Sequence, residues 1–158
     1  LPPSLGFTAA DLGAMVSNQT AIALLKEQGN CTSDIQIDAA DPGVLAFTED
    51  GLDRYLALAP LPPEYSLLDA NCNDYAEAMQ VFRSFSRLGR LGMYVAAITY
   101  LNDDGSAAGP DSHRVNIALV RRSDGSLYNQ MIEPQTRSRV PMNYARWGTK
   151  NIIYRVKF

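Results

Sequence analysis

The sequence predicts an α+β domain in which helices come first along the chain and a β-sheet follows. Up to about residue 90, apolar residues recur at three- and four-residue steps between residues that cap helices. After Gly89 the runs become uniformly apolar or alternate with period two, as is typical of strands. The length of 158 residues is that of one domain. We therefore expect a single domain over residues 1–158, with a helical part at about 1–90 packed on an antiparallel β-meander at about 92–158.

The first two helices are predicted from caps and breakers. We expect one helix over residues 8–29, from a threonine N-cap to a glycine that would stop it. Residues 31–43 should be an extended or looped link that closes with a Pro-Gly turn. A short second helix is expected between Thr48, its cap, and Pro60, which closes it. The proline-rich residues 61–65 should then form extended surface chain.

A third helix is predicted around the stretch DANCNDYAEAM, which offers Asp69 or Asn71 as its N-cap. Apolar side chains recur downstream at helical spacing until a glycine ends the pattern. This indicates a helix from about Asn73 to Leu88, with Cys72 at its N-terminal end.

The second half of the chain is predicted to be a β-meander. The run MYVAAITYL is uniformly apolar, as expected of a strand buried on both faces, and the glycine-rich residues 102–112 after it should be a loop. HRVNIALV and LYNQMIE alternate around RRSDGS, which predicts a hairpin with Asp124 and Gly125 in its turn. NIIYRVKF alternates again and should be the closing strand.

Composition excludes several classes of partner. The net charge is −3, so no global field would attract nucleic acid. No apolar run approaches the roughly 20 residues that a membrane span needs. One histidine and two cysteines far apart lack the spacing of metal ligands, so no metal is expected. The chain starts at Leu1, which suggests a processed or truncated chain or a part of a larger polypeptide, and leaves the compartment open.

The predicted position of Cys72 favours a reactive thiol. Unpaired backbone amides and the positive end of the dipole at a helix N-terminus both stabilise a thiolate and lower its pKa. Nucleophilic cysteine chemistry also needs a base within hydrogen-bonding reach and a third group that orients the base. His113 is the one histidine of the chain and so the one candidate for that base. The non-catalytic alternatives for Cys72 are a buried structural thiol and a disulfide with Cys31.

The hairpin supplies the third group. If the turn centres on Asp124, His113 lies opposite Gln135, and Glu133 is its diagonal neighbour on the same face. A one-residue shift of the turn centre would instead place Glu133 directly opposite His113. Diagonal partners lie roughly 7–8 Å apart at Cα, within reach of a glutamate and a histidine side chain. Glu133 is therefore placed to hold the imidazole.

The ordered set NCNDYAEAM, HRVNIALV and YNQMIEPQ, over roughly residues 65–135, resembles the transglutaminase-like branch of the papain-fold cysteine enzymes, in particular its bacterial cysteine proteinases. The resemblance implies a papain-like core, with Cys72 as the nucleophile, His113 as the general base and then acid, and the acid on the following strand, Glu133, as the orienting group. It implies no cofactor. The family usually has Asp where this chain has Glu133, and often an aromatic residue where Val115 stands.

Four further residues are candidates for the site. Asn71 and Asn73 are capping residues first, and either could donate to an oxyanion together with the backbone amide of Cys72. Tyr75 and Trp147 are candidates for the substrate groove, and packing is the alternative role for Trp147.

The favoured interpretation is a cysteine hydrolase or acyltransferase that cleaves an amide bond of a protein or peptide-like substrate through a thioester. Resolution of the thioester by water would make it a peptidase or amidase, and resolution by an amine a transglutaminase. Two alternatives stay open at this point: a catalytically silent binding or structural module of the same fold within a larger protein, and a module held by a Cys31–Cys72 disulfide.

Overall fold

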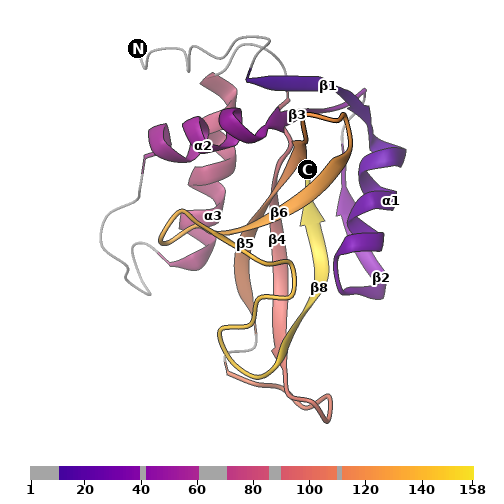
Figure 1. The fold of residues 1–158 in the computed structure, drawn as a ribbon. Coiled ribbons are helices and arrows are strands. Elements are labelled where there is room, and N and C mark those ends of the chain that lie inside the picture. The colour runs from indigo at the N-terminus through magenta and orange to yellow at the C-terminus, as the bar shows by residue number, and fades with distance from the viewer. Residues whose placement is uncertain (1–10, 40–41, 61–70, 86–89, 110–111) are drawn as a thin grey trace.

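The computed structural model of the chain describes residues 11–39, 42–60, 71–85, 90–109 and 112–158. The fold is α+β, as the sequence predicts, with helices on a large mixed sheet (Figure 1). The helices in the described residues are α1 (Asn18–Gln28), α2 (Glu49–Leu58), α3 (Cys72–Val81) and the 3₁₀ helix η1 (Phe82–Phe85). The strands there are β1 (Leu12–Ser17), β2 (Cys31–Asp38), β3 (Gly43–Thr48), β4 (Met93–Leu101), β5 (His113–Arg121), β6 (Leu127–Glu133), β7 (Ser138–Val140) and β8 (Lys150–Lys157).

The strands pair in the order β1-β3-β5-β4-β8-β2, and β6 pairs with both β5 and β7. The contacts of β3 with β5 and of β2 with β8 are parallel, and the other named pairs are antiparallel. The sheet is therefore mixed and draws on both halves of the chain. The expected antiparallel meander confined to residues 92–158 is corrected by these pairings.

The expected first helix over residues 8–29 is also corrected. Leu12–Ser17 forms strand β1 and pairs with β3, with Met15 opposite Leu45 and Val16 opposite Val44. α1 begins only after Ser17, whose side chain accepts a hydrogen bond of 3.2 Å from the Thr20 backbone amide. Pairing with a distant strand overrides the local helical pattern here. The expected start at residue 8 lies outside the described residues.

The expected link over residues 31–43 contains strand β2, and its last residue, Gly43, is already the first residue of β3. Gly43 has a φ of +152°, and a Cβ atom there would lie 2.1 Å from the carbonyl oxygen of Val16. Only glycine fits this close approach of β1 and β3. Strands β1, β2 and β3 are thus interleaved with the helices, so residues 1–90 are not purely helical.

The caps of the second and third helices are confirmed. Thr48 caps α2, and its Oγ1 accepts a hydrogen bond of 3.0 Å from the backbone of Gly51. Asn71 caps α3, which starts at Cys72 and ends at Val81, so the helix is shorter than expected. The expected end of that helix at residues 86–88, the alternative cap at residue 69 and the segment 61–65 lie outside the described residues.

The predicted strands of the second half are confirmed, as is the hairpin register. β5 and β6 pair Asn116 with Ile132 and Ile117 with Met131, as expected for a turn centred on Asp124. In the turn Gly125 adopts a φ of +89°, which favours glycine. β8 is the closing strand, but it lies between β4 and β2.

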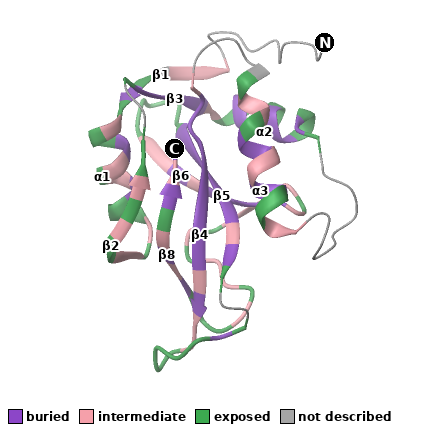
Figure 2. Cartoon of the chain, turned by 180° about the vertical axis from the view of Figure 1, so that it is seen from behind, coloured by how far each residue is buried: buried purple, intermediate pink, exposed green. Residues whose placement is uncertain are grey.

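The core lies on both faces of the central strands. α1 covers one face, whereas α2 and α3 cover the other (Figure 1). Figure 2 shows that most of β4 and β5 is buried. Tyr94 stacks on Phe158 at 4.1 Å between ring centroids on the α1 face. On the other face, Tyr55 donates a hydrogen bond to the carbonyl of Met79, which joins α2 to α3. α3 is thus held against the middle of the sheet.

Candidate functional site: a cysteine, a histidine and a glutamate

A capping box places Cys72 at the first residue of α3. Asn71 Oδ1 accepts a hydrogen bond of 3.0 Å from the Asn73 backbone amide, and Asp74 Oδ2 accepts one of 2.9 Å from the Asn71 backbone amide. Both bonds satisfy amides that a helix N-terminus would otherwise leave unpaired. Asp74 also adds a negative charge where the helix dipole favours it. The half-buried thiol of Cys72 is therefore held at a defined point.

Two buried amide side chains fix α3 on the sheet. Asn116 Nδ2 donates to the carbonyl oxygens of Ala76 in α3 and Tyr94 in β4, both at 3.0 Å. Gln80 Nε2 donates to backbone carbonyls of β4 at 3.1 Å and β8 at 2.9 Å. The sequence analysis missed both residues. Asn116 could have been found from the sequence, because it is an asparagine within the apolar run HRVNIALV. A buried amide in such a run needs hydrogen-bond partners.

The contact expected between His113 and Glu133 is present. His113 is the first residue of β5 and Glu133 the last of β6, and Nε2 of the imidazole lies 3.0 Å from Oε2 of the carboxylate. The two residues are only 5% and 6% exposed, so water screens this contact little. Gln135, whose backbone amide reaches Glu133 Oε1 at 3.4 Å, also helps to hold the carboxylate.

The thiol of Cys72 interacts with the imidazole of His113, the histidine of this pair. A side-chain hydrogen bond joins Cys72 and His113, and the backbone amide of Arg114 also hydrogen-bonds to the sulfur. Because Glu133 occupies Nε2, Nδ1 is the ring nitrogen left for the thiol. Helix α3 and the β5–β6 hairpin thus bring together Cys72, His113 and Glu133, the three residues that the sequence predicts to form a triad.

The electrostatics favour a thiolate beside an imidazolium. Burial raises the pKa of Cys72, but the hydrogen bonds from His113 and the Arg114 backbone, with the charges of both residues, outweigh it, so the pKa is lowered. Burial lowers the pKa of His113, but its contacts with Cys72 and Glu133 raise it to about 9. A lowered thiol pKa beside a raised imidazole pKa favours transfer of the thiol proton to the ring.

The second cysteine lies in a different electrostatic environment. Cys31 and Cys72 are both free thiols, so the alternative of a Cys31–Cys72 disulfide is wrong. Cys31 starts β2, and its thiol lies 3.8 Å from the carbonyl oxygen of Leu25. Burial raises the pKa of Cys31, with Lys26 opposing it less strongly. The chain therefore carries an unactivated thiol that serves as an internal comparison.

The other candidates lie in different environments. The Asn71 side chain accepts the capping hydrogen bonds, while Asn73 is exposed. Tyr75 is only 7% exposed, so its position does not support a place in an open groove. Trp147 packs edge to face on Tyr100 at 5.4 Å between centroids. The Tyr100 ring lies 6.0 Å from the His113 ring, which puts Trp147 one side chain away from the imidazole.

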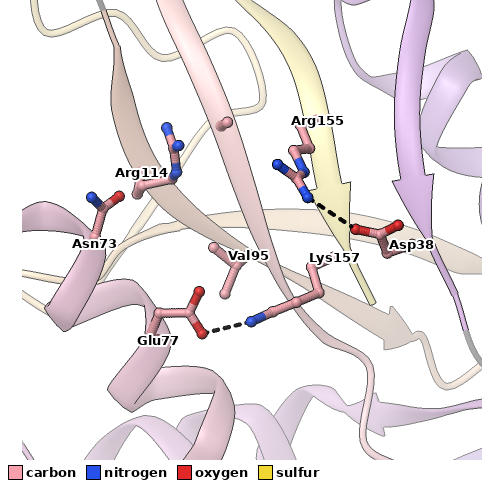
Figure 3. Close-up of a pocket in the computed structure, with 8 residues that line it drawn as sticks. Asp38, Asn73, Glu77, Val95, Arg114, Arg155 and Lys157 are labelled. Carbon is pink, nitrogen blue, oxygen red and sulfur yellow. Dashed lines mark hydrogen bonds and ion pairs between the residues drawn. The ribbon is translucent and has the colours of Figure 1, made fainter.

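A cavity of about 300 Å³ lies beside the site on the α3 face of the sheet (Figure 3). Asn73 and Arg114, which follow Cys72 and His113 in the chain, are part of its wall. The complete lining is Asp38, Asn73, Glu77, Val95, Ala97, Arg114, Arg155 and Lys157. Sequence reasoning did not find this cavity, because its charged residues come from four separate elements.

Among the described residues, no group of three or more histidine, cysteine, aspartate or glutamate side chains is arranged to hold a metal ion. No helix within the described ranges has the length and apolar character needed to cross a bilayer.

No family model and no curated protein matches the chain. Among solved structures, one with a similar fold is described as a PSL1a-E64 complex, with a TM-score of 0.60 and 15% sequence identity. The match covers 90% of this chain and 51% of the other, so this chain spans about half the length of that structure. At this identity the likeness shows the fold alone.

Proposed function

We propose that this chain is a cysteine hydrolase or acyltransferase that acts on amide bonds of protein or peptide-like substrates. The observation that carries the proposal is the hydrogen-bonded series from Cys72 at the start of α3, through the His113 imidazole, to the buried carboxylate of Glu133. This is a nucleophile, its base and a group that orients the base, in the arrangement that covalent acyl transfer needs.

The Cys72 thiolate attacks the carbonyl carbon of the substrate, and the carbonyl oxygen becomes an oxyanion. As the tetrahedral intermediate collapses, the C–N bond breaks and the imidazolium of His113 gives its proton to the leaving amine. The product is a thioester on Cys72. Water or a second amine then attacks the thioester and gives a proton to His113. The C–S bond breaks, Cys72 leaves as the thiolate, and the thiolate–imidazolium pair is restored. Glu133 fixes the ring orientation and stabilises its charge throughout.

The N-terminus of α3 supplies the proposed oxyanion donors. The backbone amide of Cys72 lies in the first turn of the helix, where the dipole is positive. Asn73 is exposed beside it and offers a side-chain amide. Asn71 has its carbonyl oxygen committed to the cap, which leaves its NH₂ group as a donor.

We also propose that the chain belongs with the transglutaminase-like branch of the papain-fold enzymes. The support is the order of Cys72, His113 and Glu133 along the chain and their placement on a helix and the following hairpin. The departure from the family at Glu133 is compatible with the role, since the longer carboxylate reaches the imidazole at 3.0 Å. Val115 is fully buried in the α1-side core, so it does not contribute to a groove.

Selective alkylation tests the proposal. At about pH 6, iodoacetamide should modify Cys72 at least about tenfold faster than a free model thiol, because only an activated cysteine is a thiolate there. Peptide mapping should show little reaction at Cys31, the thiol whose pKa is raised. In His113→Ala the rate at Cys72 should fall to that of an ordinary thiol while unfolding stays cooperative. A wild-type Cys72 no faster than the model thiol would identify the chain as a silent module of this fold.

A second probe examines the groove. E64 is the compound named with the structural neighbour, which is similar to this chain in fold. Modification of Cys72 by E64, absent in His113→Ala, would support a groove beside Cys72 that accepts this compound. Iodoacetamide reactivity without E64 reactivity would restrict the substrate to smaller or differently shaped amides.

A further inference from the structure

The cavity of Figure 3 adjoins the reactive thiol. The Arg114 backbone amide hydrogen-bonds to the Cys72 sulfur, while the Arg114 side chain lines the cavity. On the helix, Asn73 directly follows Cys72 and lines the same cavity. A group bound in the cavity would therefore lie next to the acyl centre of a substrate attacked by Cys72.

The backbone register explains why cations gather there. In the sheet, Ala97 of β4 has Arg114 of β5 as its neighbour on one side and Arg155 of β8 on the other. Val95 lies two residues before Ala97 in β4 and therefore on the same face of the sheet, and its neighbour in β8 is Lys157. The short side chains of Val95 and Ala97 leave space between the longer cationic ones (Figure 3). Like charges placed this closely repel each other unless anions lie among them.

The acidic residues of the cavity offset only part of this charge. Lys157 Nζ pairs with Glu77 Oε2 at 2.7 Å, and Arg155 pairs with Asp38 at 3.5 Å (Figure 3). Arg114 donates from Nη1 to the neutral hydroxyl of Tyr154 at 3.3 Å. No carboxylate of the described residues pairs with its guanidinium. Three cationic and two anionic side chains leave one net positive charge, although the whole chain carries −3.

We infer that this cavity binds a carboxylate of the substrate, so that the proposed enzyme acts on amides that carry an acidic group near the bond to be cleaved. The inference rests on the proposed function of Cys72. A guanidinium recognises a carboxylate through two parallel hydrogen bonds, and Arg114 is the cation of the cavity that pairs with no carboxylate within the described part of the chain. The Asn73 side chain adds a neutral donor at the wall nearest the thiol. One excess positive charge matches a monoanionic carboxylate better than a dianionic phosphate.

A matched pair of alkylating reagents tests this subsite. N-bromoacetyl-glutamate amide and N-bromoacetyl-glutamine amide have the same size, and only the first carries a carboxylate. Their rates at Cys72 in the full chain give a ratio, which is divided by the same ratio for a free thiol. We expect wild type to prefer the glutamate reagent by about tenfold, the effect of one charged hydrogen bond. The ratio cancels any change in the reactivity of the thiol itself.

Two substitutions should move this ratio in opposite directions. Arg114→Gln removes the excess positive charge and should bring the preference close to that of a free thiol. Glu77→Gln frees Lys157 from its pair and should raise the preference above wild type. The control is Arg122→Gln, which removes an exposed cation in the β5–β6 turn and should leave the ratio unchanged. If Arg114→Gln fails to fold, Lys157→Gln replaces it and should also lower the ratio.

Two results would overturn the carboxylate subsite. In the first, wild type prefers the glutamate reagent no more than a free thiol does. In the second, the preference survives both Arg114→Gln and Lys157→Gln. These outcomes differ from a failure of the proposed function, in which both reagents would react with Cys72 no faster than with the free thiol.

Discussion

At the scale of single residues, His113 connects the other two members of the site. Its Nε2 contacts Glu133, and Nδ1 is the ring nitrogen left for the thiol of Cys72. The two strands place His113 and Glu133 diagonally, where glutamate reaches farther than aspartate by one methylene. The choice of acid therefore fits the register of the hairpin.

Cys72 and Glu133 together raise the pKa of His113 against the effect of burial, and the part due to Glu133 can be tested alone. The pKa of His113 is raised to about 9, so the imidazole is protonated at neutral pH and loses its proton as pH rises through that value. Glu133→Gln removes the charge and should move the titration midpoint down toward the ordinary value of about 6.5. The resonance of the one histidine in the chain, followed by NMR, reports this midpoint directly.

Two further variants complete this measurement. Glu133→Asp shortens the side chain and should give an intermediate midpoint, whereas Glu49→Gln, on the exposed start of α2, should leave it at the wild-type value. A midpoint that is the same in wild type and Glu133→Gln would refute the role given to this carboxylate. Turnover should also decline as pH rises through about 9, since His113 then lacks the proton for the leaving amine.

At the scale of elements, the site depends on how α3 is fixed to the sheet. Local signals predicted the cap of α3 and the β5–β6 turn correctly, because each depends on a few neighbouring residues. The same kind of signal failed for Leu12–Ser17, where pairing with β3 decides the conformation. Asn116 was missed for a related reason: its partners, Ala76 and Tyr94, are distant in the sequence.

Asn116→Ala should weaken the attachment of α3. The substitution removes two buried hydrogen bonds, and we expect the free energy of unfolding to fall by about 2 kcal/mol. Chemical denaturation of the variant measures this change. Asn143→Ala, at an exposed position, is the matched control and should change the free energy by less than about 0.5 kcal/mol. Equal stabilities of the two variants would contradict the anchoring role of Asn116.

At the scale of the whole molecule, two helical layers enclose a mixed sheet, and the site lies where α3 meets the β5–β6 hairpin (Figure 1). The α+β class and the order of Cys72, His113 and Glu133 were predictable, since they follow from composition, periodicity and one hairpin register. The mixed sheet and the cavity were not, because β2, β3 and β8 reach their partners from distant parts of the chain. The positive cavity on a negative chain emerges only from that assembly.

The central claim is that Cys72 is a thiolate held by His113. Titration of the thiolate absorbance at about 240 nm, taken as wild type minus Cys72→Ser, tests it most directly. Our account predicts a midpoint well below the ordinary thiol value of 9.0, and a return toward that value in His113→Ala. A wild-type midpoint at or above 9.0, unaffected by loss of the imidazole, would contradict it.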